Sequence, residues 1–258
     1  MSSSCMMQSD FQASQIIWSA DVSRDKIKHI ISSNGLLKGT VFKLDRLFFE
    51  NNSKNFIDFC QDAGYPVFAD AKIVEIPSKS LEIAQTYLKH KPWMLNIMAG
   101  ACSTGIFEDA EKNNLDALKR FADACQKAGT KSCAVTVLTS KSDELCREEF
   151  HGRSPLEQVL AYVEMLIRAG FTDVVCSPKE ARAIREEFGD AIDINTPGIR
   201  LPKSDTHDQK RVTTPHQAFE AGATRIVVGR DLTGDGTNLK QKIGARYGRL
   251  IENIQMNR

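Results

Sequence analysis

Short runs of apolar residues alternate along the chain with longer segments in which apolar residues recur at a helical spacing. The short runs are nearly continuous, which is typical of strands that are buried on both faces of a parallel sheet. The pattern therefore predicts eight strands, at residues 16–20, 40–44, 66–70, 94–98, 132–138, 173–176, 191–195 and 225–228.

Helices are predicted between these strands, at residues 55–64, 78–90, 108–129, 155–170, 178–188 and 215–222. In the fourth of them, the apolar residues that share one stripe of the helix surface are Leu156, Val159, Leu160, Val163 and Leu166. Three predicted helices start with a capping residue followed by proline, in Ser154-Pro155, Ser177-Pro178 and Thr214-Pro215. Three end at a glycine, which is the residue that most often terminates a helix: Gly129, Gly170 and Gly222.

The alternation of strands and helices predicts an α/β protein, and a count of eight favours closure into a TIM (β/α)8 barrel. The length of 258 residues is typical of one such barrel. An open doubly wound sheet would show the same alternation, but no G-x-G-x-x-G motif follows the first strand. We expect a single catalytic barrel domain over residues 14–258, after a polar, flexible N-terminal tail at residues 1–13.

Composition and charge narrow the range of partners. The formal net charge is +1 and 26% of the residues are charged, so neither a nucleic-acid nor a membrane partner is expected. No segment has the apolar length of a membrane span or the form of a secretory signal. The seven cysteines include no C-x-x-C pair, which favours reduced thiols in a cytoplasmic protein. The five histidines form no group with metal-ligand spacing, so no metal site is expected.

Charged residues gather where the predicted strands end, which is the edge where TIM barrels hold their active sites. Asp21 follows the first strand, Lys43 lies in the second, and Asp70 and Lys72 end the third. Asp70 and Lys72 are two positions apart, so on an extended backbone both would point into one pocket. Asp21 and Lys43 would extend this set to alternating charges. Such a network would hold a lysine charged as a proton donor; the alternative is an ion-pair ladder that only closes the barrel.

Glycine and arginine residues follow the last two strands, where TIM barrels commonly bind phosphate. Gly198 and Gly229 let backbone N–H groups approach an anion, and Arg200 and Arg230 offer guanidinium groups to phosphate oxygens. The polar stretch 201–211 is long enough for a functional lid, with a solvated surface loop as the alternative. We therefore predict a barrel enzyme that binds a phosphorylated substrate.

An ordered set of motifs runs through the second half of the chain. It consists of TPGIR at 196–200, DQKR at 208–211, TP at 214–215 and VVGR at 227–230, preceded by AVTVLTS at 134–140. Together with the Asp-x-Lys of Asp70 and Lys72, this set resembles orotidine 5'-phosphate decarboxylases of the bacterial type, over nearly the whole chain after the tail. The resemblance implies decarboxylation of orotidine 5'-monophosphate (OMP) to UMP, a reaction of pyrimidine biosynthesis, with no metal or organic cofactor.

The resemblance also implies roles for individual residues. Lys72 resembles the lysine that protonates C6 as CO₂ leaves, Asp70 the carboxylate placed against the leaving group, and Lys43 the first lysine of the charge network. Asp21 is similar to the ribose-binding aspartate, and Thr139 to the residue at the pyrimidine edge. The further residues with an implied substrate contact are Pro197, Arg200, Gln209, Gly229 and Arg230. Of these, Gln209 and Arg230 resemble the pair that binds the phosphate.

Three positions depart from the family pattern. Glu75 stands where an aspartate is usual, Met98 where a histidine is usual, and Asp45 where a glycine is usual. The resemblance implies a homodimer in which the acid at position 75 is contributed across the interface. One extra methylene could displace that carboxylate by about 1 Å, at a cost on the order of 100-fold in rate. Two alternatives therefore stay open: a related lyase that uses magnesium on another phosphorylated substrate, and a nucleotide-binding paralogue without activity.

Overall fold

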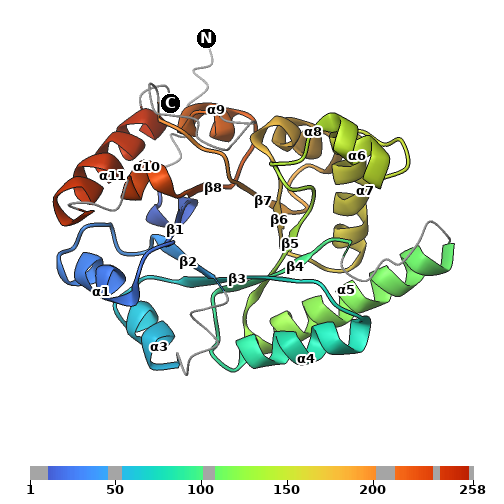
Figure 1. Cartoon of the computed structure of the whole chain (residues 1–258), viewed down its shortest axis with the longest axis horizontal. Helices are drawn as coiled ribbons and strands as arrows, with labels where there is room; N and C mark the ends of the chain where they lie inside the picture. The colour runs from blue at the N-terminus through green and yellow to red at the C-terminus, as the bar shows by residue number, and fades with distance from the viewer. Residues whose placement is uncertain (1–10, 46–53, 101–107, 202–212, 235–238, 256–258) are drawn as a thin grey trace, which may run out of the picture.

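The computed structural model describes residues 11–45, 54–100, 108–201, 213–234 and 239–255. Parallel strands close into a barrel in chain order, with β1 paired to both β2 and β8 (Figure 1). The strands are β1 (Ile16–Ser19), β2 (Val41–Asp45), β3 (Val67–Ile73), β4 (Met94–Met98), β5 (Lys131–Val135), β6 (Asp173–Val175), β7 (Asp193–Thr196) and β8 (Arg225–Val228). The predicted TIM barrel is confirmed, and closure excludes the open doubly wound sheet.

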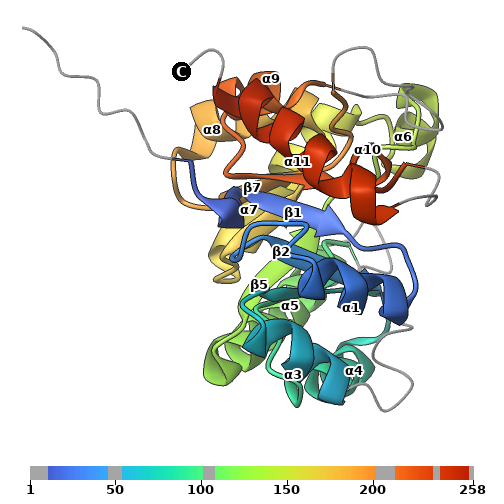
Figure 2. The same cartoon turned by 90° about the vertical axis from the view of Figure 1, so that its left-hand side faces the viewer.

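Helices surround the barrel (Figures 1 and 2). They are α1 (Arg24–Ser32), α3 (Lys54–Asp62), α4 (Pro77–Leu88), α5 (Glu108–Ala128), α6 (Asp143–Glu149), α7 (Pro155–Arg168), α8 (Pro178–Phe188), α9 (Pro215–Glu220), α10 (Arg230–Thr233) and α11 (Leu239–Gln255). The helices α1, α6, α10 and α11 were not among those predicted. For α6 the reason is its length, because seven residues with one buried side chain give no apolar period. None of the described helices is both long and apolar enough to cross a membrane.

The caps of three helices confirm their predicted starts. At α7 the Ser154 hydroxyl accepts a hydrogen bond from the Glu157 N–H, and the Glu157 carboxylate accepts one from the Ser154 N–H at 2.7 Å. The same reciprocal pair forms on Ser177 at α8 and on Thr214 at α9, each followed by proline. The chain therefore enters these three helices at defined residues, which sets the length of the loops that precede them.

Two strand ends differ from the prediction by three residues, and packed structure reaches further toward the N-terminus than predicted. β3 continues past residue 70 to Ile73, whereas β5 ends at Val135 rather than at residue 138. Val137 and Leu138 instead line a cavity at the end of the barrel. Phe11 packs against the core and a short 3-10 helix, η1 (Ala13–Gln15), precedes β1, so packed structure begins before residue 14. Residues 1–10 of the predicted tail lie outside the described residues.

The barrel interior is filled by side chains from the strands. Six buried residues from six strands form one cluster: Ile17, Val41, Phe68, Met94, Cys133 and Val227. Two larger clusters lie between the outer faces of the strands and the helices. Burial on both faces accounts for the nearly continuous apolar runs of the sequence. The charged residues of the strands lie at the two ends of the barrel.

The N-terminal end of the barrel carries an ion-pair network, which we call the lower network. Arg225 donates from Nη1 to Asp173 Oδ1 at 2.7 Å and from Nη2 to Asp193 Oδ2 at 2.8 Å. Lys131 Nζ lies 3.3 Å from a carboxylate oxygen of each aspartate. The Trp93 ring covers both cations, with its centroid 5.2 Å from the Arg225 guanidinium and 5.7 Å from the Lys131 ammonium. Each member is the first residue of its strand, so the network closes this end of the barrel.

Candidate active site

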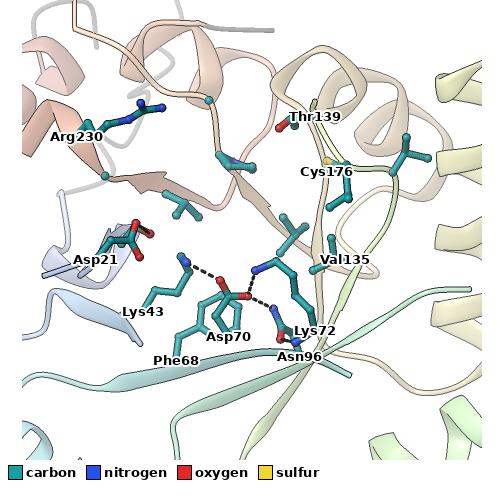
Figure 3. A pocket seen from close by; sticks show the side chains of 18 of the residues that line it. Asp21, Lys43, Phe68, Asp70, Lys72, Asn96, Val135, Thr139, Cys176 and Arg230 are labelled. Carbon is teal, nitrogen blue, oxygen red and sulfur yellow. Dashed lines mark hydrogen bonds and ion pairs between the residues drawn. The ribbon is translucent and has the colours of Figure 1, made fainter. Parts of the chain in front are cut away.

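A cavity of about 290 Å³ opens at the C-terminal end of the barrel (Figure 3). Its lining brings together nine of the eleven predicted site residues, namely Asp21, Lys43, Asp70, Lys72, Thr139, Pro197, Arg200, Gly229 and Arg230. The two others are Glu75, which is not in the lining, and Gln209, which lies outside the described residues. The cavity is thus assembled from most of the strand ends, as the rule for TIM barrels predicts.

A second ion-pair network lies in the cavity, and we call it the upper network. Asp70 accepts hydrogen bonds from Lys43 Nζ at 2.5 Å and from Lys72 Nζ at 2.6 Å, one on each carboxylate oxygen (Figure 3). The Asp70 side chain is 6% exposed, whereas that of Lys72 is 45% exposed. Burial by itself would raise the pKa of Asp70, but the charges and hydrogen bonds of Lys43 and Lys72 outweigh it and lower the pKa to about 2. Asp70 is therefore a carboxylate at any physiological pH.

The backbone that presents Lys72 is not a regular strand, although the spacing of Asp70 and Lys72 predicts an extended one. The pairing of β3 with β4 shifts between Ala69 and Ile73, and Lys72 has a φ of 43°. Its N–H donates to the Asn96 side-chain oxygen at 2.7 Å. Asp70 and Lys72 still reach the same cavity, as predicted, but a local irregularity places them there.

Asn96 belongs to the upper network although no prediction included it. Its Nδ2 donates to Asp70 Oδ1 at 2.7 Å, and the residue is 1% exposed. The available signal was one amide within the apolar run MLNIM at residues 94–98. A buried polar side chain in a strand must find partners, and here the partners are the neighbouring catalytic candidates.

Asp21 lines the cavity but does not extend the alternating charges. It accepts a hydrogen bond from the Ser19 hydroxyl at 3.0 Å, and the described residues show no ion pair between Asp21 and Lys43. The network of charges therefore consists of Lys43, Asp70 and Lys72, without the predicted fourth member Asp21. Asp21 stands exposed at the cavity wall, from where its carboxylate can accept hydrogen bonds from a ligand's hydroxyl groups.

The loops after β7 and β8 form the cationic side of the cavity. Gly198 has a φ of 82°, a conformation that favours glycine, and the Gly198 carbonyl accepts a hydrogen bond from the Thr213 N–H. Arg200 lines the cavity although it is largely buried, and it donates from Nη1 to the Ile199 carbonyl at 2.8 Å. Gly229 and Arg230 stand where β8 turns into α10, and both line the cavity. Residues 202–212, which hold most of the predicted lid, lie outside the described residues.

Glu75 is exposed outside the cavity of its own chain. It follows β3 at the start of α4, where its Oε1 accepts a hydrogen bond from the Ile76 N–H at 3.1 Å. The residues on either side are apolar and open to solvent, with Val74 63% and Ile76 60% exposed. The other two departures from the family pattern, Asp45 and Met98, end β2 and β4 without lining the cavity.

Part of the cavity wall is apolar. The side chains that make it up are Val135, Val137, Leu138, Val175 and Cys176. The cavity thus combines an apolar wall, a charged cluster and two loops with arginines, which together suit an anionic ligand that also has an apolar part. Within the described part of the chain, no group of three or more His, Cys, Asp or Glu side chains is placed to hold a metal ion.

Comparisons with known proteins identify relatives of the chain. Residues 14–244 match the model of the family described as orotidine 5'-phosphate decarboxylase / HUMPS. The chain is similar to the orotidine 5'-phosphate decarboxylase of Pseudoalteromonas translucida, at 35% identity over 191 residues, which cover 74% of this chain and 78% of that protein. The orotidine 5'-phosphate decarboxylase of Mannheimia succiniciproducens is 32% identical over 211 residues, which cover 81% of this chain and 86% of that protein.

Solved structures show the same likeness. The crystal structure of orotidine 5'-phosphate decarboxylase from Lactobacillus acidophilus has a TM-score of 0.72 and 28% identity, and the match covers 93% of this chain and 98% of that chain. An uncharacterized conserved protein from Geobacillus kaustophilus shares the fold, with a TM-score of 0.70 at 22% identity. The sequence matches and the first of these structures thus point to one group of enzymes.

Proposed function

The chain belongs to the orotidine 5'-phosphate decarboxylase / HUMPS family, and on this basis we propose that it decarboxylates OMP to UMP and CO₂. It is a carboxy-lyase of pyrimidine biosynthesis. The observation that carries the proposal is the upper network, in which one buried carboxylate holds two lysine ammonium groups at a cavity. Within one chain this cluster has one more cation than anions, which suits a ligand or partner group that brings negative charge.

The proposed reaction uses the side chains of the upper network and a proton from water. The bond between C6 and the substrate carboxylate breaks, CO₂ leaves, and the electron pair stays on C6. Lys72, the more exposed of the two lysines, transfers a proton from Nζ to C6, and its amine regains a proton from water. Lys43 and Lys72 stabilise the negative charge at C6 while it develops. Asp70, ionised throughout, keeps both ammonium groups in position.

The cavity offers a separate region to each part of the nucleotide. We assign the pyrimidine to the apolar wall with Thr139 at its edge, and the ribose hydroxyl groups to Asp21. The phosphate is assigned to Arg230 with the backbone of Gly229, and to Gln209 by the family pattern. Arg200 and Pro197 line the cavity beside them. Guanidinium forks and backbone N–H groups are the usual ligands of phosphate oxygens.

A homodimer completes the site in this proposal. Glu75 does not line the cavity of its own chain, and Val74 and Ile76 beside it expose apolar side chains. Exposed apolar residues next to each other are typical of protein interfaces. Packing of a second copy over these residues would bury them and bring Glu75 to the partner's upper network.

The cysteines favour a reducing compartment, and we infer a cytoplasmic location. Cys60, Cys125, Cys133, Cys146 and Cys176 are buried free thiols. Burial raises the pKa of Cys60 and Cys125 to about 12, so these thiols stay protonated and unreactive. Thiols of this kind are usual in proteins of the reducing cytoplasm.

The loss of OMP absorbance in the presence of the purified protein tests the proposal. The wild type should consume OMP, and Lys72→Ala should lower kcat by about 10⁴-fold because the proton donor is lost. UMP binding should remain measurable in that variant. Lys131→Ala is the matched control, since it removes a lysine from the lower network and should leave kcat unchanged below its unfolding temperature. Undiminished turnover by Lys72→Ala would refute the assignment.

Two further measurements separate the alternatives. Activity on a ketose phosphate that is lost with EDTA would indicate a magnesium-dependent lyase instead. Tight UMP binding without OMP turnover, with turnover restored by Glu75→Asp, would indicate a nucleotide-binding paralogue. If the proposal holds, EDTA has no effect and Glu75→Asp changes kcat by at most about 100-fold.

A further inference from the structure

Asn96 lies at the centre of β4 with its side chain inside the barrel end. Leu95 and Ile97 pack outward against the helices, while Met94 belongs to the interior cluster, so Asn96 shares the inward face. Figure 3 shows its amide beside the carboxylate of Asp70. An amide that is 1% exposed among apolar neighbours needs hydrogen-bond partners of its own.

Its position coincides with an irregularity in the neighbouring strand. Ala69 pairs with Leu95 and Ile73 with Ile97, so three residues of β3 stand opposite Asn96 alone. Within this bulge Lys72 adopts a φ of 43°, which is costly for a residue with a side chain. The other described non-glycine residues with positive φ are Asn34, Lys91 and His151, which follow the ends of α1, α4 and α6. Lys72 is thus the one described case inside a strand.

The Asn96 amide bonds to both ends of the bulge. The Lys72 N–H donates to Asn96 Oδ1 at 2.7 Å, and Asn96 Nδ2 donates to Asp70 Oδ1 at 2.7 Å. The orientation of the amide is unambiguous, because a backbone N–H only donates and a carboxylate only accepts. The Asp70 oxygen that it contacts is the same one that receives the Lys72 ammonium. One side chain therefore ties the strained backbone of Lys72 to the carboxylate that its own ammonium contacts.

We infer that Asn96 is a positioning residue for the decarboxylation, one that holds the β3 bulge so that Asp70 and Lys72 keep their places in the cavity. The inference rests on the proposed function. Without the amide, the Lys72 backbone N–H loses its acceptor, and Asp70 loses the hydrogen bond from Asn96 Nδ2. The bulge can then relax, and a displacement of about 1 Å in a catalytic group costs on the order of 100-fold in rate.

A matched control lies next to the lower network. Asn195 is also a buried inward amide, and its Nδ2 donates to Asp173 Oδ1 and to the Val174 carbonyl, each at 3.1 Å. It serves a carboxylate in an ion-pair network as Asn96 does, but at the end of the barrel away from the cavity. Asn195→Ala should lower the unfolding temperature and leave kcat unchanged at temperatures well below it.

The test compares Asn96→Ala with the wild type and with Asn195→Ala. We expect kcat on OMP to fall by about 100-fold in Asn96→Ala, with UMP binding retained. Hydrogen exchange of the Lys72 amide should become faster in the same variant, because the N–H has lost its acceptor. A residue with a merely structural role would lower the unfolding temperature without moving either readout.

Asn96→Asp adds a rescue that depends on pH. A protonated carboxyl can donate to Asp70 and accept from the Lys72 N–H, so it reproduces both bonds of the amide, whereas the ionised form repels Asp70. The charged groups around it are Asp70 and Lys72 on β3 and Lys43 on β2, and Cys133 on β5 is a neutral thiol because burial raises its pKa. The ratio of variant to wild-type kcat should therefore rise as the pH is lowered, by up to about tenfold per pH unit.

Each outcome decides the inference. If the wild type consumes OMP and Asn96→Ala keeps its kcat, Asn96 is not a positioning residue. If Asn96→Ala does not fold, the pH dependence of Asn96→Asp decides, and a flat ratio rejects the inference. If the wild type does not consume OMP, the proposed function fails by itself, and unchanged exchange of the Lys72 amide in Asn96→Ala would also reject the role of Asn96.

Discussion

The barrel carries an ion-pair network at each end, and the two networks differ in charge balance and in exposure. The lower network pairs two cations with two carboxylates and lies under the ring of Trp93. The upper network gives one carboxylate to two lysines and faces a cavity of about 290 Å³. Both are built from residues of neighbouring strands, so strand geometry alone does not distinguish them.

The difference shows which of the two networks is prepared for a ligand. Charges removed from water must be compensated, and the lower network compensates itself. Within one chain, the upper network has one more cation than carboxylates beside open space. An anionic substrate, or Glu75 of a second copy in the proposed homodimer, can balance that charge. The ion-pair ladder that was the alternative interpretation of the upper residues does exist in this protein, but at the opposite end of the barrel.

Replacing one aspartate in each network should give the largest effects. Asp173 should affect mainly the stability of the protein, and Asp70 mainly its activity. Asp173→Asn leaves Arg225 buried with one carboxylate fewer, so the free energy of unfolding should fall by about 3–5 kcal/mol. Asp70→Asn should lower kcat by about 10²–10³-fold, because the two lysines lose the anion that orients them. Urea unfolding and OMP turnover measured on both variants test this crossed pattern. Equal losses of activity in the two folded variants would contradict the distinction between the networks.

The upper network should make the free energy of unfolding depend on pH in the acid range. The pKa of Asp70 is lowered in the folded state from 3.8 to about 2, so its contribution to stability is complete above pH 3.8 and is lost as the pH falls through 2. Between pH 5 and pH 2, wild-type stability should therefore fall by about 2 kcal/mol more than that of Asp70→Asn. Urea unfolding at each pH measures the difference. Parallel curves for the two proteins would show that Asp70 does not carry this stability.

A conservative exchange in the lower network should have the smallest effect. Arg225→Lys keeps the positive charge but cannot donate to Asp173 and Asp193 through one planar group. The loss of one such bond should cost about 1 kcal/mol, seen as a lower unfolding temperature. OMP turnover should stay at the wild-type value. A fall in turnover would mean that the two ends of the barrel are coupled.

Much of the fold could be predicted because it depends on local pattern. Buried strands need apolar residues on both faces, and capped helix starts need specific residues at Ser154, Ser177 and Thr214. The charged residues at the strand ends followed from the same reasoning, since parallel strands end at one edge. Helix α6 was missed because it buries only Cys146.

Other features had no local signal. Asn96 acquires its role from a bulge in β3, and nothing in the spacing of Asp70 and Lys72 indicates that Lys72 has a positive φ. The lower network joins residues from four separate strands, each an ordinary charged residue in its own segment. The resemblance marks Glu75 as a departure from the family pattern, while only the folded chain shows that it is exposed outside the cavity.

The sequence by itself determines the order of strands and helices, because periodicity and capping act over a few residues. It also determines that eight strands can close and that the active site lies at their C-terminal ends. The charge balance at each end of the barrel is a property of contacts between distant segments. Only the folded structure shows that Asp70 serves two lysines beside open space while Asp173 and Asp193 neutralise Lys131 and Arg225. The physical reason is that Coulomb energy depends on distance and burial in space, not on separation along the chain.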